Sequence, residues 1–104
     1  MEIKINQDGN NIEAQIIGRF DTVAAQNSED DFKPLFNHAD KNITLILDQL
    51  TYVSSSGLRV FLNLRKEVIA KGGNLVLRNL TDEVQSVFTM TGFSKIFTIE
   101  QIII

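Results

Sequence analysis

The spacing of the apolar residues switches between two and about 3.6 along the chain, and this alternation constrains the fold more than any other feature. In the first stretch, EIKINQDGNNIEAQIIG, apolar and polar residues alternate on both sides of an Asp8-Gly9 turn. A period of two around Asp-Gly is typical of a β-hairpin. We therefore expect strands near residues 2–7 and 11–18.

A helical spacing begins at Thr22 and brings a set of apolar residues onto one face. Pro34 lies inside this pattern and should bend or break the helix, because proline lacks a backbone N–H donor. The acidic run Glu29–Asp31 lies away from the centre of the apolar face, as is typical of a solvated helix surface. The residues of the predicted inner face are Ala25, Ser28, Phe32, Leu35, Phe36 and Ala39.

A short apolar run at residues 43–47 fits a strand that is buried on both faces. After the stretch YVSSSGLRV the pattern becomes helical, and Ser55 should lie at or just before the start of this helix. Gly72-Gly73 should end the helix after Lys71, because glycine adopts the left-handed C-terminal conformation without strain. The predicted inner face contains Leu58, Phe61, Leu62, Val68 and Ile69, widened by Val60 and Leu64.

The rest of the chain contains a strand in NLVLRNL, a helix capped by Thr81 and ended by Gly92, and a last strand that begins within SKIFTIEQIII. The resulting order is β-β-α-β-α-β-α-β. This order predicts an α/β fold with a mixed sheet of about five strands and helices largely on one face. A length of 104 residues suits a single domain over residues 1–104.

Composition excludes several classes of function. Thirteen acidic and ten basic residues give a net charge of −3 without a basic cluster, so we expect no nucleic-acid partner. The absence of cysteine excludes disulfides and thiolate zinc sites. The N-terminal MEIKIN lacks the apolar run of a signal peptide, and no segment reaches about 18 apolar residues. We therefore expect a cytoplasmic protein that does not insert into membranes.

Three serines, Ser54–Ser56, precede the predicted helix and form the candidate chemical site. A serine nucleophile needs a base nearby, but the only histidine, His38, lies at the far end of another predicted helix. A phosphate-binding loop matches poorly, because no G-x-x-x-x-G-K-[ST] run is present. Helix capping uses one hydroxyl and leaves two unexplained. A third hypothesis is that a kinase phosphorylates one of these serines, because the dipole of the helix tolerates a phosphate at its N-terminus.

Several motifs in register resemble those of the STAS domain, as found in bacterial anti-sigma-factor antagonists. The segment SSSGLRV is similar to the Ser-Ser-Ala-Gly-Leu-Arg-Val form of the family, and it is followed by a helix that closes in Gly-Gly. Val84, Phe88 and Gly92 match the pattern V-x-x-x-F-x-x-x-G, and GRFD at residues 18–21 is similar to Gly-x-Leu-Asp. The similarity covers nearly the whole chain. It implies a STAS-type fold and a binding switch that is not an enzyme and needs no cofactor or metal.

The resemblance also implies roles for individual residues. Ser55 falls on the position of the phosphorylated serine, and Asp21 matches an aspartate expected close to the phosphorylation loop. Ser54 occupies a position where the family often has an acidic residue. The implied partner-binding residues are Asp21, Ser54, Ser55, Ser56, Gly57 and Arg59.

The implied partners are an anti-sigma factor that is a serine kinase with a GHKL-type ATP fold, and a PP2C-type phosphatase. The unphosphorylated antagonist would bind the anti-sigma factor and free a sigma factor, and phosphorylation would release the antagonist. An accessory STAS subunit of a lipid-transport ABC system is the alternative. Such a subunit would bind an ATPase and would need no phosphorylation.

The end of the sequence departs from the family pattern. Members usually carry a final amphipathic helix, whereas this sequence closes in EQIII, so we expect that helix to be absent or reduced to a stub. The apolar tail Ile102–Ile104 should then pack on the domain, because burying each side chain is worth about 1.5–3 kcal/mol. Pairing of two copies into a homodimer is the competing outcome.

Overall fold

The computed structural model describes residues 1–102, and its elements follow the predicted alternation with three additions. The first predicted helix is divided in two, a short strand β4 precedes the serine run, and a 3-10 helix η1 follows the last α-helix. In chain order the elements are β1 (Glu2–Asp8), β2 (Asn11–Phe20), α1 (Thr22–Gln26), α2 (Glu29–Asn37), β3 (Asn42–Ile46), β4 (Leu50–Val53), α3 (Ser55–Lys71), β5 (Asn74–Arg78), α4 (Asp82–Thr91), η1 (Phe93–Lys95) and β6 (Thr98–Glu100).

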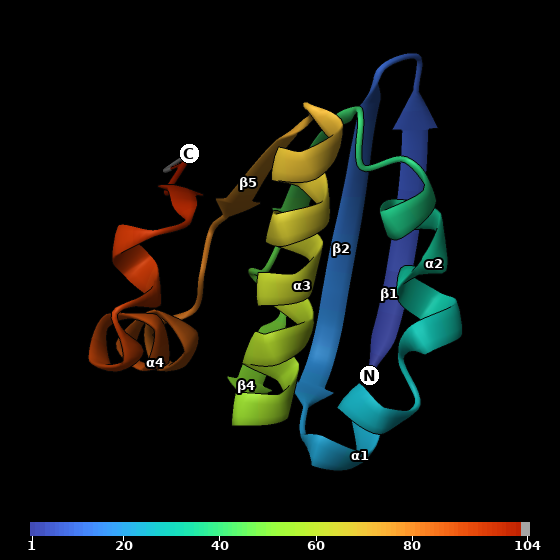
Figure 1. Cartoon of the computed structure of the whole chain (residues 1–104). Coiled ribbons are helices and arrows are strands. Elements are labelled where there is room, and N and C mark those ends of the chain that lie inside the picture. Colours follow the sequence, from blue (N-terminus) through green and yellow to red (C-terminus); the bar gives the residue numbers. More distant parts are fainter. Residues whose placement is uncertain (103–104) are drawn as a thin grey trace.

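The strands form one six-stranded mixed sheet with the helices largely on one face (Figure 1). β1 and β2 pair antiparallel, with Ile3 opposite Ile16 and Ile5 opposite Ala14. β3, β5 and β6 continue the sheet beyond β2 as parallel strands. The predicted hairpin and the predicted fold class are confirmed.

The sheet has one strand more than the five that the sequence predicts, and the additional strand is β4. It pairs parallel with the end of β2 after a register shift between Gly18 and Arg19. Only Leu50 and Val53 of its four residues are buried, so the strand has no alternating pattern for the sequence to show. Its pairing with β2 places the serines that follow it beside the end of that strand.

The first predicted helix is broken between α1 and α2 at Asn27 and Ser28, and not at Pro34. The Ser28 hydroxyl donates to the carbonyl oxygen of Ala25 at 2.8 Å, which satisfies an acceptor at the end of α1. Pro34 lies within α2, which continues to Asn37, so the expected break there is wrong. The proline removes one donor from the hydrogen-bond ladder of α2, and the helix continues past it.

Phenylalanines from β2, α2, α3 and α4 form the centre of the core. The Phe20 ring stacks on Phe32 at 5.6 Å between centroids and meets Phe61 edge-on at 5.4 Å. Phe61 in turn lies 6.3 Å from Phe88. All four side chains are fully buried, so the inner face of α3 is fixed against both the sheet and α2.

Two predictions about burial are wrong in detail. On α3 the inner face is centred on Phe61 and Leu64, and Ile69 is 60% exposed. In β3, Ile43 and Leu45 are buried, but the alternate residues Asn42, Thr44 and Ile46 are only half-buried. β3 therefore has one buried face, not two. The predicted end of α3 is confirmed, since Gly72 has a left-handed conformation with φ of 77°.

The face of the sheet opposite the buried one carries polar side chains in register. At the start of the parallel strands, the amide of Asn42 donates to Asn11 at 3.2 Å. Asn74 donates to Asn42 at 2.8 Å, so one hydrogen-bonded row crosses β2, β3 and β5. We call this set the asparagine row.

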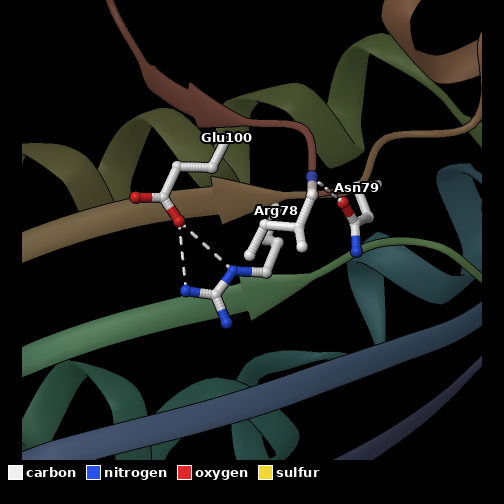
Figure 2. Close-up of polar contacts among 4 residues, drawn as sticks. Arg78, Asn79 and Glu100 are labelled. Carbon is white, nitrogen blue, oxygen red and sulfur yellow. Dashed lines mark hydrogen bonds and ion pairs between the residues drawn. The ribbon is translucent and has the colours of Figure 1, made fainter. Parts of the chain in front are cut away.

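At the end of β5, the side chains of Arg78 and Asn79 contact Glu100 of β6 and the backbone of Ile102 (Figure 2). Arg78 forms an ion pair with Glu100 at 3.0 Å. Asn79 has a positive φ of 57°, and its side-chain oxygen accepts from the Ile102 backbone N–H at 2.7 Å. Ile102 is 47% exposed, so it packs only in part on the domain. Ile103 and Ile104 lie outside the described residues.

Candidate partner-binding site

The candidate site lies where β2 and β4 end side by side. The Ser54 N–H donates to the carbonyl oxygen of Phe20 at 2.8 Å and so joins the ends of the two strands. Asp21 follows β2 directly, and Ser55 follows Ser54 as the first residue of α3. Figure 1 shows the start of α3, the end of β2 and α1 at the same end of the molecule. The sequence-distant residues Asp21 and Ser55 are therefore brought to one region.

Ser54 is the N-cap of α3 and is buried. Its hydroxyl oxygen accepts from the Gly57 N–H at 3.1 Å and donates to the Phe20 carbonyl at 3.0 Å. Both capacities of the hydroxyl are thus used inside the molecule. An ionised carboxylate at this position could keep the cap but could not donate to the carbonyl. The local geometry therefore suits serine in the place where the family often has an acid.

Ser55 is exposed in the first turn of α3, and the predicted position of this serine is confirmed. Ser56 is half-buried. Among the described residues, neither hydroxyl makes a hydrogen bond within the chain. Of the three serines, Ser55 is therefore the most exposed.

Gly57 is buried against the end of β2. A Cβ atom there would lie 2.9 Å from the Phe20 carbonyl oxygen and 3.0 Å from the Phe20 ring. The glycine therefore allows α3 to approach β2 closely, which is an internal role. Phe20 contacts both Ser54 and Gly57 through its carbonyl and ring. Nothing in the residue pattern singles it out, and only the pairing of β2 with β4 reveals its role.

Asp21 and Arg59 complete the predicted set. Asp21 is half-buried and caps α1, with its carboxylate accepting from the Ala24 N–H at 2.8 Å. α1 contacts α3, which carries the serines. Arg59 is exposed one turn after Ser55, so both side chains lie on one helix face. Within the described part of the chain, Arg59 makes no ion pair.

Other chemistries find no support at this site. His38 follows the end of α2, where its ring nitrogen lies 2.9 Å from the Pro34 carbonyl oxygen. It precedes β3, whereas the serines follow β4, so the parallel sheet separates them. Over residues 1–102 no group of three His, Asp or Glu side chains could hold a metal ion. No helix in this part of the chain is long and apolar enough to span a bilayer.

Comparison with known proteins identifies the family. A model of the STAS domain family matches residues 2–103. The chain belongs to the STAS domain family. This STAS chain is 29% identical over 99 residues to the anti-sigma-B factor antagonist of Bacillus subtilis, covering 95% of this chain and 90% of the relative. It is 33% identical over 82 residues to BtrV of Bordetella bronchiseptica, covering 79% and 71%.

Solved structures show the same fold. The unphosphorylated form of the anti-sigma factor antagonist SpoIIAA superimposes with a TM-score of 0.79, covering 98% of this STAS chain and 89% of SpoIIAA, at 17% identity. The phosphorylated form of Bacillus SpoIIAA gives a TM-score of 0.73 at 16% identity, covering 98% and 92%. At this identity the likeness concerns the fold, which both forms of SpoIIAA share with this chain.

Proposed function

We propose that this chain is an anti-sigma factor antagonist that binds an anti-sigma serine kinase while Ser55 is unphosphorylated. The observation that carries the proposal is the position of Ser55, exposed in the first turn of α3 beside a buried capping serine. The names of the relatives, one an anti-sigma-B factor antagonist, support the class of partner. In this proposal the chain acts by binding and needs no cofactor.

Phosphorylation of Ser55 would act through surface charge. A phosphate adds about −1.5 to −2 charges at pH 7. At the N-terminus of α3 the helix dipole favours negative charge, so the fold would be retained. The partner would meet an anion where it had bound a neutral hydroxyl, and the cost of desolvating that anion would release the antagonist.

The other predicted site residues and the phosphatase also have places in this proposal. Ser56, Arg59 and Asp21 would surround Ser55 in the interface with the kinase. Ser54 and Gly57 would shape the interface from inside, because they hold the start of α3 on Phe20. A PP2C-type phosphatase would remove the phosphate and restore binding, and the cycle would take place in the cytoplasm.

Three variants test the switch: Ser55→Ala, Ser55→Asp and the neighbouring control Ser56→Ala. Each is incubated with purified GHKL-type kinases from the source organism and ATP, and intact mass is measured. We expect phosphate on the wild type and on Ser56→Ala but none on Ser55→Ala. In calorimetry without ATP, Ser55→Asp should bind the kinase about 1–3 kcal/mol more weakly than the wild type, because it places a charge in the interface.

Equal affinity of the wild type and Ser55→Asp would contradict the proposal. Phosphate found on Ser55→Ala would show that the kinase modifies a residue other than Ser55. An accessory subunit of an ABC system would instead bind an ATPase and remain unmodified with every kinase.

A further inference from the structure

A surface pocket of about 440 Å³ lies between α2 and α3, at the junction with α1. Its apolar lining includes Ala25 of α1, Phe36 of α2 and Val60 of α3, all half-buried. Both α1 and α2 contact α3, on the helical face of the sheet (Figure 1). We call this feature the α2–α3 pocket.

Acidic side chains line the α2–α3 pocket on one side. Glu29 and Asp30 belong to its lining, and both are exposed. Among the described residues, neither carboxylate has a Lys, Arg or His nitrogen within ion-pair distance. Lys33 is the only cation among the lining residues, and the whole chain has a net charge of −3. The pocket therefore combines an apolar lining with two acids and one base, a net negative charge that favours a ligand that is apolar and basic.

The pocket continues the surface around Ser55. Val60 and Asn63 line the pocket and lie four and seven residues after Ser56, a spacing that puts them on one face of α3. On the other side, Ala25 belongs to α1, the helix that Asp21 caps. A partner that covers Ser55, Ser56 and Asp21 would reach the pocket without leaving this surface.

We infer that the α2–α3 pocket is the second part of the interface with the anti-sigma kinase. It receives a segment of that kinase in which an apolar side chain is flanked by Lys or Arg. This inference rests on the proposed function and assigns a role to Glu29 and Asp30 of the acidic run. The acidic residues steer the basic segment towards the pocket, while the apolar lining holds the side chain that enters it.

The test compares two double variants that remove the same charge at matched positions. E29Q/D30N neutralises the first turn of α2 beside the pocket. D82N/E83Q neutralises the first turn of α4, where both acids are also exposed and next to a helix dipole. Association and dissociation rates with the purified kinase are measured by stopped flow in ADP, which prevents phosphorylation, at low and high salt.

For E29Q/D30N we expect association about tenfold slower at low salt, with a weaker dependence on salt than the wild type. D82N/E83Q should remain within about twofold of the wild type, because neither Asp82 nor Glu83 lines the pocket. A second pair, Val60→Lys and the exposed control Ile69→Lys, tests the apolar lining. Val60→Lys should dissociate at least about tenfold faster, since it places a charge where the apolar side chain enters, and Ile69→Lys should not.

The outcomes separate this inference from the proposed function. If Ser55→Asp weakens binding but E29Q/D30N and Val60→Lys behave like their controls, the switch stands and the pocket is not part of the interface. If both double variants slow association equally, the effect is one of net charge and the inference is wrong. If the wild type binds no kinase, the proposed function fails and the inference fails with it. If the chain self-associates and only E29Q/D30N changes that association, the α2–α3 pocket is occupied by a second copy of the chain and not by the kinase.

Discussion

At the scale of single residues, Ser54 shows how a hydroxyl can be fitted to one position. Because it both accepts from Gly57 and donates to the Phe20 carbonyl, neither alanine nor aspartate can replace it fully. We expect Ser54→Ala to lower the free energy of unfolding by about 1–2 kcal/mol through loss of the cap. Ser54→Asp should be no more stable than Ser54→Ala, because it brings a buried carboxylate next to a carbonyl oxygen. Denaturant unfolding measures both.

The control for Ser54 is Ser56→Ala in the same turn, which should change the free energy of unfolding by less than about 0.5 kcal/mol. If Ser54→Asp matched the wild type in stability, donation to Phe20 would contribute nothing to the fold.

Gly57 gives a second prediction at this scale. A methyl group there would meet the Phe20 carbonyl and ring at 2.9–3.0 Å. We expect Gly57→Ala to cost about 1–3 kcal/mol through overpacking, against which alanine gains about 1 kcal/mol in helix propensity. The net loss should appear as a lower denaturation midpoint. A variant more stable than the wild type would show that α3 can move away from β2 at no cost.

At the scale of elements, the sequence predicted those whose signals are local. The hairpin around Asp8-Gly9 and the end of α3 at Gly72 depend on turn chemistry, which the residues themselves carry. Strand β4 depends on its partner β2, which is distant in sequence. The break before Glu29 involves a short-range bond from Ser28 to Ala25, but Ser28 fits the helical spacing and so gives no sign of the break. The prediction at Pro34 was wrong because the proline removes one donor and the remaining bonds continue α2 to Asn37.

In the candidate site, too, the features with local signals could be predicted and those that depend on packing could not. The start of α3 and the exposure of Ser55 could be predicted, because a change of hydrophobic period marks the helix start. The buried state of Ser54 and the role of Phe20 could not, because both depend on how closely β2 and β4 approach. The α2–α3 pocket combines Glu29, Val60 and Ala25 from three helices, so only the packing of those helices brings it together.

The link between β5 and the end of the chain gives a prediction at the scale of elements. Asn79 combines a positive φ of 57° with a side-chain bond to the Ile102 N–H. Asn79→Gly should keep the backbone conformation and lose only the bond, whereas Asn79→Ala should lose both. We therefore expect faster hydrogen exchange of the Ile102 amide in both variants, but a loss of about 1–2 kcal/mol in unfolding free energy only for Asn79→Ala. Equal stability of the two variants would show that the conformation carries no strain.

At the scale of the whole molecule, helices cover one face of the sheet (Figure 1). The other face carries the asparagine row and the Arg78–Glu100 pair. Both lie on strands whose alternate residues form the core. This arrangement explains why β3 is buried on one side only, although its sequence suggested both. An apolar run in sequence gives the average burial of a strand, while the placement of the helices decides which of its faces is covered.

The bond between Ser54 and the Phe20 carbonyl bears on how the proposed switch behaves in time. Because the start of α3 is fixed to the stacked phenylalanine core, a phosphate on Ser55 would mark the surface without reshaping what lies beneath it. Such a mark would not decay through a conformational relaxation of the chain. The phosphate ester would then be the sole record of past kinase activity. The phosphate would remain until a phosphatase removed it. The rates of the kinase and the phosphatase, and not the motions of this chain, would therefore set the duration of the signal.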